Sequence, residues 1–102
     1  MLNKKTEALM KTLTTEKVSV IHAAFGDDPY VVAFVDVEKS WTDIDKLEYA
    51  FMKTNSINDA WWNNEDVTSM FPDKGCRSTS VGDMVLIGKT KYQVSNSGWK
   101  KI

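Results

Sequence analysis

The sequence predicts an α+β domain: a mostly antiparallel sheet of four to five strands, one helix packed on it and a peripheral N-terminal helix. Three observations support this class. Two apolar, β-branched runs flank a Gly-Asp-Asp-Pro turn at residues 26–29. An amphipathic pattern of helical period then spans residues 43–53. Two short strand patterns in the last third are joined by a tight turn at 88–90. At this length, residues 1–102 are expected to form a single domain.

The first elements follow from spacing. Apolar residues recur on one helical face over residues 2–13, with lysines on the other, which predicts the peripheral helix. Strands are predicted at Val18–Phe25 and Tyr30–Val37, paired as an antiparallel hairpin at the heart of the sheet. The second strand is apolar at nearly every position, which indicates a central strand covered on both faces.

Thr42 is a suitable N-cap for a helix over residues 43–53, and Asn55 is a reasonable C-cap. Four residues at helical spacing are predicted to face the sheet: Ile44, Leu47, Ala50 and Phe51.

Residues 56–76 have no clear period, and ordered connectors of this length are often functional. After residues 77–83, strands are predicted at Met84–Ile87 and Lys91–Val94, and a short edge strand at Trp99–Ile102.

His22 and Cys76 are the only residues of their types, so neither an internal disulfide nor a common zinc ligand set can form. No calcium-binding loop, phosphate-binding glycine loop or nucleophile elbow is present, and we expect no metal and no cofactor. His22 in an apolar strand favours a structural role, and Cys76 beside Arg77 has the setting of an activated thiol. A small enzyme using His22 or Cys76 remains an alternative to a non-enzymatic protein.

Trp61 and Trp62 lie in an asparagine-rich loop. Large aromatic side chains in such a loop can stack on bases or anchor a protein interface. Adjacent strand residues point to opposite faces, which favours a core position for at least one of them. Neighbouring acids make a protein partner more plausible than nucleic acid for the exposed one.

The segment Arg77–Asp83 concentrates a guanidinium, three hydroxyls and a carboxylate just before a strand. A structural interpretation has Ser78, Thr79 and Ser80 bonding backbone groups, Gly82 adopting a special φ and Asp83 pairing with Arg77. A functional interpretation has Arg77 and the hydroxyls facing a phosphate or a carboxylate. The residues proposed for partner binding are Trp61, Trp62, Arg77, Ser78, Thr79, Ser80 and Asp83, the last four mainly by shaping the loop.

Charge is unevenly spread although the formal net charge is −1. Residues 27–66 hold ten acids and three lysines, whereas four lysines and no acid follow Asp83. The small net charge argues against a protein that coats nucleic acid. Nucleic-acid binding through Lys89, Lys91, Lys100, Lys101 and the aromatics remains an alternative. No signal peptide or membrane-spanning segment is recognisable, which predicts a cytoplasmic protein that does not bind membranes.

Several segments resemble a known group. These are Leu47-Glu48-Tyr49-Ala50-Phe51, Thr54-Asn55, the tryptophan loop, Arg77-Ser78-Thr79-Ser80-Val81-Gly82-Asp83, and Tyr92 before Gly98-Trp99. Together, over about residues 47–102, they are similar to small tailed-bacteriophage proteins of unassigned activity. The Arg-Ser-Thr-Ser-Val-Gly-Asp segment and its hairpin also look like the YodL-like domain. The resemblance implies a phage accessory protein in the bacterial cytoplasm that binds a host protein, and it carries over no catalytic residue.

Overall fold

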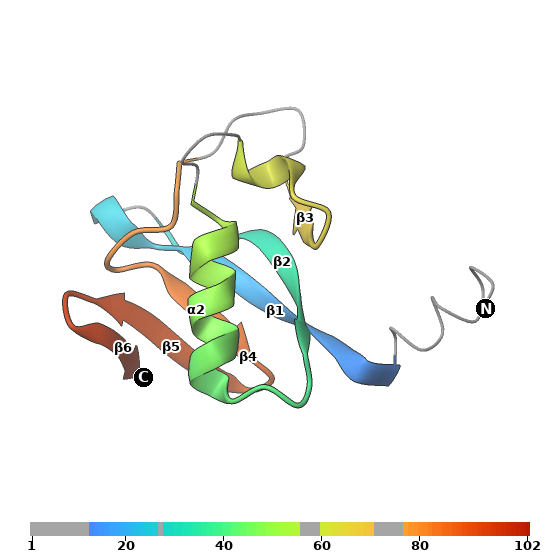
Figure 1. The fold of residues 1–102 in the computed structure, drawn as a ribbon. Helices are drawn as coiled ribbons and strands as arrows, with labels where there is room; N and C mark the ends of the chain where they lie inside the picture. The colour runs from blue at the N-terminus through green and yellow to red at the C-terminus, as the bar shows by residue number, and fades with distance from the viewer. Residues whose placement is uncertain (1–12, 27, 56–59, 71–76) are drawn as a thin grey trace.

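A computed structural model describes residues 13–26, 28–55, 60–70 and 77–102. Within these ranges the chain forms one six-stranded sheet with the order β3-β2-β1-β4-β5-β6, and every strand pair is antiparallel (Figure 1). The strands are β1 (Thr15–His22), β2 (Tyr30–Glu38), β3 (Val67–Ser69), β4 (Met84–Ile87), β5 (Thr90–Ser95) and β6 (Gly98–Lys101). The helices are α2 (Asp43–Lys53) and the short 3-10 turns η1 (Ala24–Gly26) and η2 (Trp61–Asn63). The predicted N-terminal helix and Cys76 lie outside the described residues.

The α+β class and the central β1–β2 hairpin are confirmed, but the sheet has six strands, not four or five. The strand missed by the sequence is β3, which has only three residues and pairs with Ala33–Val35 of β2. A strand this short shows no measurable alternation, so its position depends on its partner. The C-terminal strands lie close to the predicted ranges.

The end of β1 differs from the prediction. The strand stops at His22, three residues before the expected end, after a register shift between Val20 and Ile21. The chain then enters η1, where Phe25 has a φ of 65°. This turn moves Phe25 out of the sheet and places it on the surface, 76% exposed.

Helix α2 packs on one face of the sheet. Thr42 caps its N-terminus by accepting a hydrogen bond from the Asp45 backbone N–H, as predicted. Its buried residues are Lys46, Leu47 and Ala50, and Ile44 is 55% exposed, so the prediction that Ile44 faces the sheet is wrong. The helix is rotated so that Lys46 reaches Glu16 at 2.6 Å. Thr54, not Asn55, is the C-cap.

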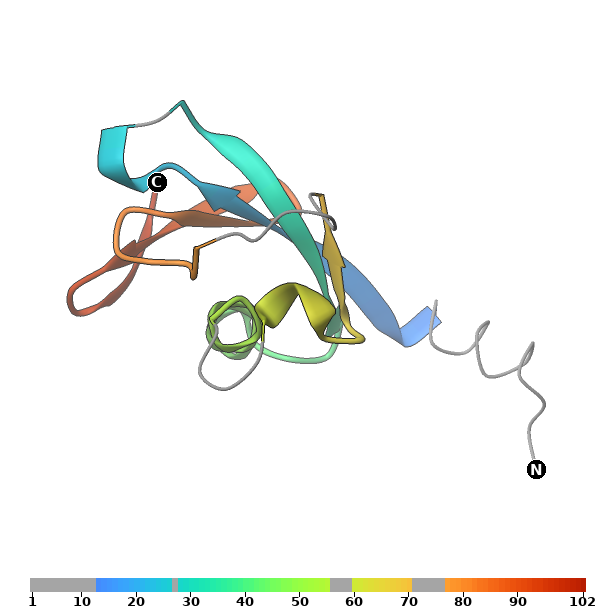
Figure 2. The same ribbon diagram turned by 90° about the horizontal axis from the view of Figure 1, so that it is seen from above.

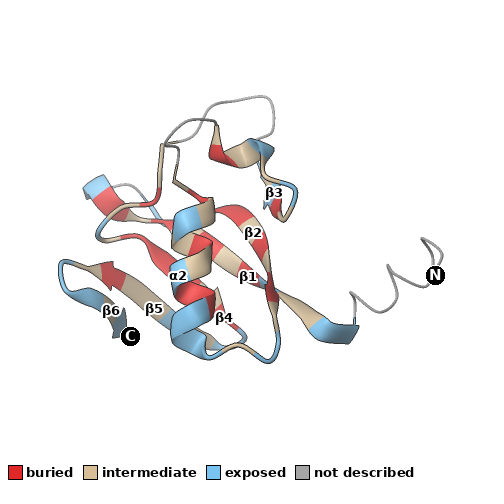
Figure 3. Cartoon of the chain, viewed as in Figure 1, coloured by how far each residue is buried: buried red, intermediate tan, exposed pale blue. Residues whose placement is uncertain are grey.

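The core lies between α2 and the inner sheet face and is built mainly of small β-branched side chains from β1, β2 and β4 (Figure 3). Trp61, from η2, closes one end of it. On the opposite face, Val31 and Phe34 of β2 are only half-buried, and α2 and η2 both lie on the core side (Figure 2). Within the described residues, α2 therefore covers only one face of β2, and the residues of its other face are half-buried.

Candidate functional site

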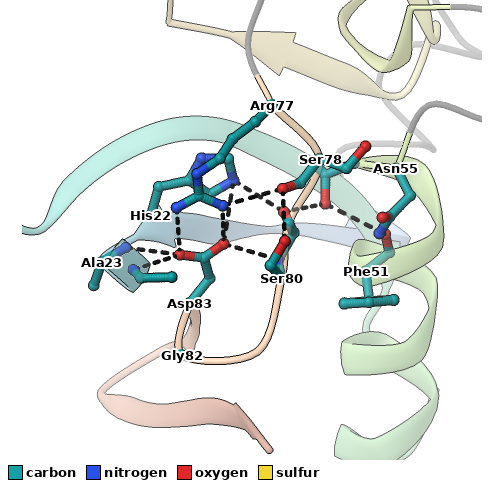
Figure 4. Close-up of polar contacts among 12 residues, drawn as sticks. His22, Ala23, Phe51, Asn55, Arg77, Ser78, Ser80, Gly82 and Asp83 are labelled. Carbon is teal, nitrogen blue, oxygen red and sulfur yellow. Dashed lines mark hydrogen bonds and ion pairs between the residues drawn. The ribbon is translucent and has the colours of Figure 1, made fainter. Parts of the chain in front are cut away.

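The segment Arg77–Asp83 is organised around the carboxylate of Asp83, which is fully buried (Figure 4). Its Oδ1 accepts hydrogen bonds from the backbone N–H groups of Ala23 (2.8 Å) and Ala24 (2.9 Å). Its Oδ2 accepts one from the Ser80 N–H at 2.8 Å. Arg77 donates to both oxygens, from Nη1 at 2.5 Å and from Nη2 at 2.8 Å. The predicted pairing of Arg77 with Asp83 is thus confirmed, in the bidentate geometry that makes such pairs strong.

Gly82 allows this loop to close, as the sequence predicted. Its φ is 99°, which disfavours any side chain, and an added Cβ would lie 3.3 Å from the Ala24 Cβ. The Gly82 N–H donates to the Val94 carbonyl at 2.9 Å. The loop therefore packs directly on η1 and on β5.

The electrostatics of the site follow from these contacts. Burial by itself raises the pKa of Asp83, but the Arg77 guanidinium and the backbone N–H groups of Ala24, Ser80 and Ala23 outweigh it and hold the pKa at about 2. Asp83 is therefore ionised at neutral pH. Its negative charge is neutralised by Arg77, whose side chain is 31% exposed.

A second chain of hydrogen bonds begins at His22, which is completely buried at the end of β1. Its Nε2 lies 3.1 Å from Thr79 Oγ1, and Thr79 Oγ1 lies 2.8 Å from Thr54 Oγ1. Thr54 donates to the Ala50 carbonyl at 2.8 Å, so its oxygen is left to accept from Thr79. The Thr79 oxygen then accepts from His22, which assigns the proton of the neutral ring to Nε2.

The imidazole is held in its neutral form. Burial lowers the pKa of His22. The negative charge of Asp83, whose Oδ2 lies 3.8 Å from Nε2, raises this pKa, and the positive charge of Arg77 lowers it. The net direction is below the ordinary value. The second ring nitrogen, Nδ1, is buried and has no hydrogen-bond partner among the described residues, so protonation there would leave a charged donor unsatisfied.

These groups join three segments that are far apart in the sequence: the end of β1, the end of α2 and residues 77–83. The Thr79 hydroxyl, which is hydrogen-bonded to His22, is itself buried and already hydrogen-bonded on both sides. A general base has to reach a proton on a bound substrate, and here both partners are enclosed. The arrangement is suited to fixing the loop in place.

A dependence of stability on pH follows from the two shifted groups. Because the pKa of folded His22 lies below that of the unfolded chain, the free energy of unfolding should fall as pH drops below about 6.5. The pKa of Asp83 is lowered to about 2, so its contribution, about 2 kcal/mol, is present above pH 4 and is lost between about pH 4 and pH 2. Urea unfolding at a series of pH values measures both steps.

The control for the upper step is His22→Gln, since His22 is the only histidine of the chain. The variant should lose the slope between about pH 7 and pH 5.5 while keeping the fall below pH 4. An unchanged upper slope would contradict the assignment of that step to His22.

The other residues predicted to bind a partner are placed as follows. Trp61 is 1% exposed, and its indole Nε1 donates to the Arg77 carbonyl at 3.1 Å, so the expectation that it contacts a partner is wrong. Trp62 is half-buried, with its ring edge-on to that of Trp61 at 5.7 Å. The predicted division into one core and one more accessible tryptophan therefore holds.

The serines and Thr79 remain within the loop. Ser78 and Ser80 are half-buried, the Ser80 hydroxyl donates to the Ser78 carbonyl at 3.3 Å, and Thr79 is buried. The Ser80 hydroxyl thus bonds a backbone group, as the structural interpretation predicted, whereas the Thr79 hydroxyl bonds the side chains of His22 and Thr54 instead.

Sequence reasoning missed Phe25 and Thr54. The sequence pattern predicts Phe25 as the last residue of a strand, whereas in the structure the Arg77 guanidinium lies 4.8 Å from its ring centroid. The Gly-Asp-Asp-Pro turn that follows is the only local signal that the strand ends early. No sequence signal marks Thr54, because its hydroxyl can hydrogen-bond Thr79 only after α2 has packed on the sheet.

Among the strand lysines near the C-terminus, Lys101 lies on the opposite face of the sheet from Lys91 and Lys100. Lys100 pairs with Gln93, whereas Lys101 pairs with Tyr92, whose hydroxyl reaches Asp43 at 2.9 Å beside α2. Residues adjacent on a strand point to opposite faces, so Lys100 and Lys101 lie on different sides of the sheet. This division weakens the case for a basic nucleic-acid surface.

Among the described residues, no group of three potential metal-ligating side chains is found, and no helix is long and apolar enough to span a membrane. Comparison of the chain with protein-family models, with curated proteins and with solved structures yields no match.

Proposed function

We propose that this chain is a small non-enzymatic binding module that engages a protein partner through a surface corner formed by Phe25, Arg77 and Val81. Given the resemblance to tailed-bacteriophage proteins, the partner proposed is a host protein in the bacterial cytoplasm. The observation that carries the proposal is a large aromatic side chain held on the surface in a strained backbone conformation.

Phe25 combines a left-handed backbone with strong exposure. Its φ of 65° is unfavourable for a bulky residue, and its side chain is 76% exposed, so no burial of the ring offsets the cost. Such strain persists where the surroundings over-determine the backbone, and it tends to cluster at functional sites. Here the two preceding N–H groups are both fixed by Asp83.

The neighbours of Phe25 form a prearranged surface. Arg77 is held by Asp83 and lies over the ring, so its guanidinium and the ring are ordered together. Val81, 52% exposed, precedes Gly82, which packs against Ala24. Aromatic residues and arginine are enriched among the residues that contribute most to protein interfaces, and rigid anchors lower the entropic cost of binding.

The alternatives are less well supported. For an enzyme, His22 is enclosed with Thr79. For nucleic-acid binding, Lys101 lies on the opposite face of the sheet from Lys91 and Lys100. Salt dependence tests the nucleic-acid alternative, because such binding should weaken steeply from low to moderate ionic strength. A mobility shift that is absent or insensitive to salt would eliminate it.

Phe25→Asn tests the corner, because asparagine tolerates positive φ and removes the ring. The variant should be as stable as the original chain or up to about 1 kcal/mol more stable, since strain is relieved. In affinity capture from bacterial lysate with quantitative mass spectrometry, it should retain about a tenth or less of the specific partner. The matched control, Ile44→Asn, removes an exposed apolar side chain from α2 and should capture the partner normally. Equal capture by both variants would rule the corner out.

A further inference from the structure

A separate hollow lies along α2, beside the loop that precedes it. It has a volume of about 430 Å³ and combines two aromatic rings, a methionine and two carboxylates. Its lining residues are Trp41, Asp45, Glu48, Tyr49 and Met52. We call it the aromatic–acidic groove.

A neighbouring hollow of about 260 Å³ shares Trp41 and Tyr49 with this groove. It adds three further carboxylates, those of Asp36, Glu38 and Asp66. The two rings therefore form a wall between two acidic depressions, and none of these residues belongs to the Phe25 corner.

The aromatic wall is ordered. The rings of Trp41 and Tyr49 meet edge-on, with centroids 5.0 Å apart and planes at 70°, and both residues pack against the core. The Tyr49 hydroxyl donates a hydrogen bond to Asp66 Oδ2. Burial and this carboxylate raise the pKa of Tyr49 to about 12, so the hydroxyl stays protonated and the ring stays anchored. An ordered wall lowers the entropic cost of binding a side chain against it.

The charge of the groove is negative. Asp36 is paired with Lys17, and Asp66 lies 3.9 Å from Lys53. Glu38, Asp45 and Glu48 take part in none of the ion pairs found among the described residues. Lys46, the other lysine of α2, is buried against Glu16. The unmatched charge favours a cationic partner and disfavours nucleic acid or an anionic membrane.

A cation of the chain itself already lies near one ring of this wall. The Lys53 Nζ lies 5.4 Å from the centroid of the Tyr49 ring. Rings of tyrosine and tryptophan attract ammonium and guanidinium groups through their electron-rich faces, and carboxylates nearby add to the attraction. The apolar stem of an arginine or lysine can lie along Met52 while its charged end reaches the acids.

From this geometry we infer that the aromatic–acidic groove binds a basic segment of a protein, with one arginine or lysine side chain held between Trp41 and the carboxylates of Asp45 and Glu48. This inference does not depend on the Phe25 corner, and either can fail alone.

The test is a titration of the ¹⁵N-labelled protein with a short acetylated peptide containing three arginines spaced by serine and leucine. The shifts should concentrate on the Trp41 indole N–H and on the backbone of residues 45–52. A peptide with citrulline in place of arginine keeps the shape without the charge. Its affinity should be lower by about tenfold or more.

Two charge-matched variants decide whether the groove is the site. Glu48→Lys should weaken binding of the arginine peptide about tenfold or more, because it places a like charge in the groove. Asp28→Lys makes the same change of charge at an exposed position in the β1–β2 turn and should weaken binding less than about twofold. Equal losses in the two variants, equal binding of the citrulline peptide, or shifts spread evenly over the surface would overturn the inference. If Glu48→Lys still captured the partner of the Phe25 corner normally, the proposal for that corner would stand even though the groove had been altered.

Discussion

Asp83→Ala is expected to lower the free energy of unfolding by about 3–5 kcal/mol, the largest effect of any single polar substitution in the described chain. The variant leaves the Arg77 guanidinium without its carboxylate and removes the acceptor for three backbone N–H groups. Those donors are held in a region that water reaches poorly, so each loses its hydrogen bond without replacement. Urea or thermal unfolding measures the loss.

The control for this prediction is Asp43→Ala. Asp43 is an exposed carboxylate that accepts a hydrogen bond from Tyr92 at 2.9 Å, and its removal should cost about 1 kcal/mol or less. If the two variants were equally stable, Asp83 would not be the centre of the loop.

A double-mutant cycle measures the coupling free energy between Arg77 and Asp83. Arg77→Ala alone leaves a buried carboxylate with only its backbone donors, and we expect a loss of about 2–4 kcal/mol. In the Asp83→Ala background the same substitution should cost much less, because the pair has already been broken. Additive losses would show that Arg77 and Asp83 act independently.

The second large effect is expected for Trp61→Ala, with a loss of about 3–5 kcal/mol. The side chain is the largest of those fully buried and packs in the core cluster formed by the described residues. The substitution leaves a cavity under η2 and removes the hydrogen bond from the indole to the Arg77 carbonyl. Unfolding in urea, followed by circular dichroism so that the lost fluorophore does not matter, gives the value.

Trp62→Ala is the natural comparison, since the neighbouring ring is only half-buried. It should cost less than half as much as Trp61→Ala. Trp61→Phe should fall between them, because it keeps most of the packing and loses the indole donor, worth about 1 kcal/mol. A larger effect at Trp62 than at Trp61 would reverse the assignment of core and surface.

The local elements of this chain were predictable because their signals are local. Thr42 and the acids of the first turn indicate the start of α2, and the turn at residues 88–90 sets the pairing of β4 with β5. The same holds for Arg77 and Asp83, which are six residues apart with Gly82 between them, so a turn alone can bring them together.

Positions that depend on distant contacts were not predictable in this way. Hydrophobicity suggests that Ile44 is buried and Lys46 exposed. In the structure Ile44 is exposed and Lys46 is buried, because α2 is rotated to bring Lys46 to Glu16. The three residues of β3 become a strand only beside β2. In each case the contact that sets the position of the residue is made with a residue more than fifteen positions away along the chain.

The sequence by itself therefore determined the α+β class, the central hairpin, the limits of α2 and the Arg77–Asp83 pairing. Only the tertiary structure joined His22 to Thr79 and Thr54, placed Trp61 in the core and Phe25 on the surface, and set Trp41 beside Tyr49 among carboxylates. The physical reason is that caps, turns and hydrophobic periods act over a few residues. Helix rotation, strand register and buried hydrogen bonds are settled only when distant segments pack together.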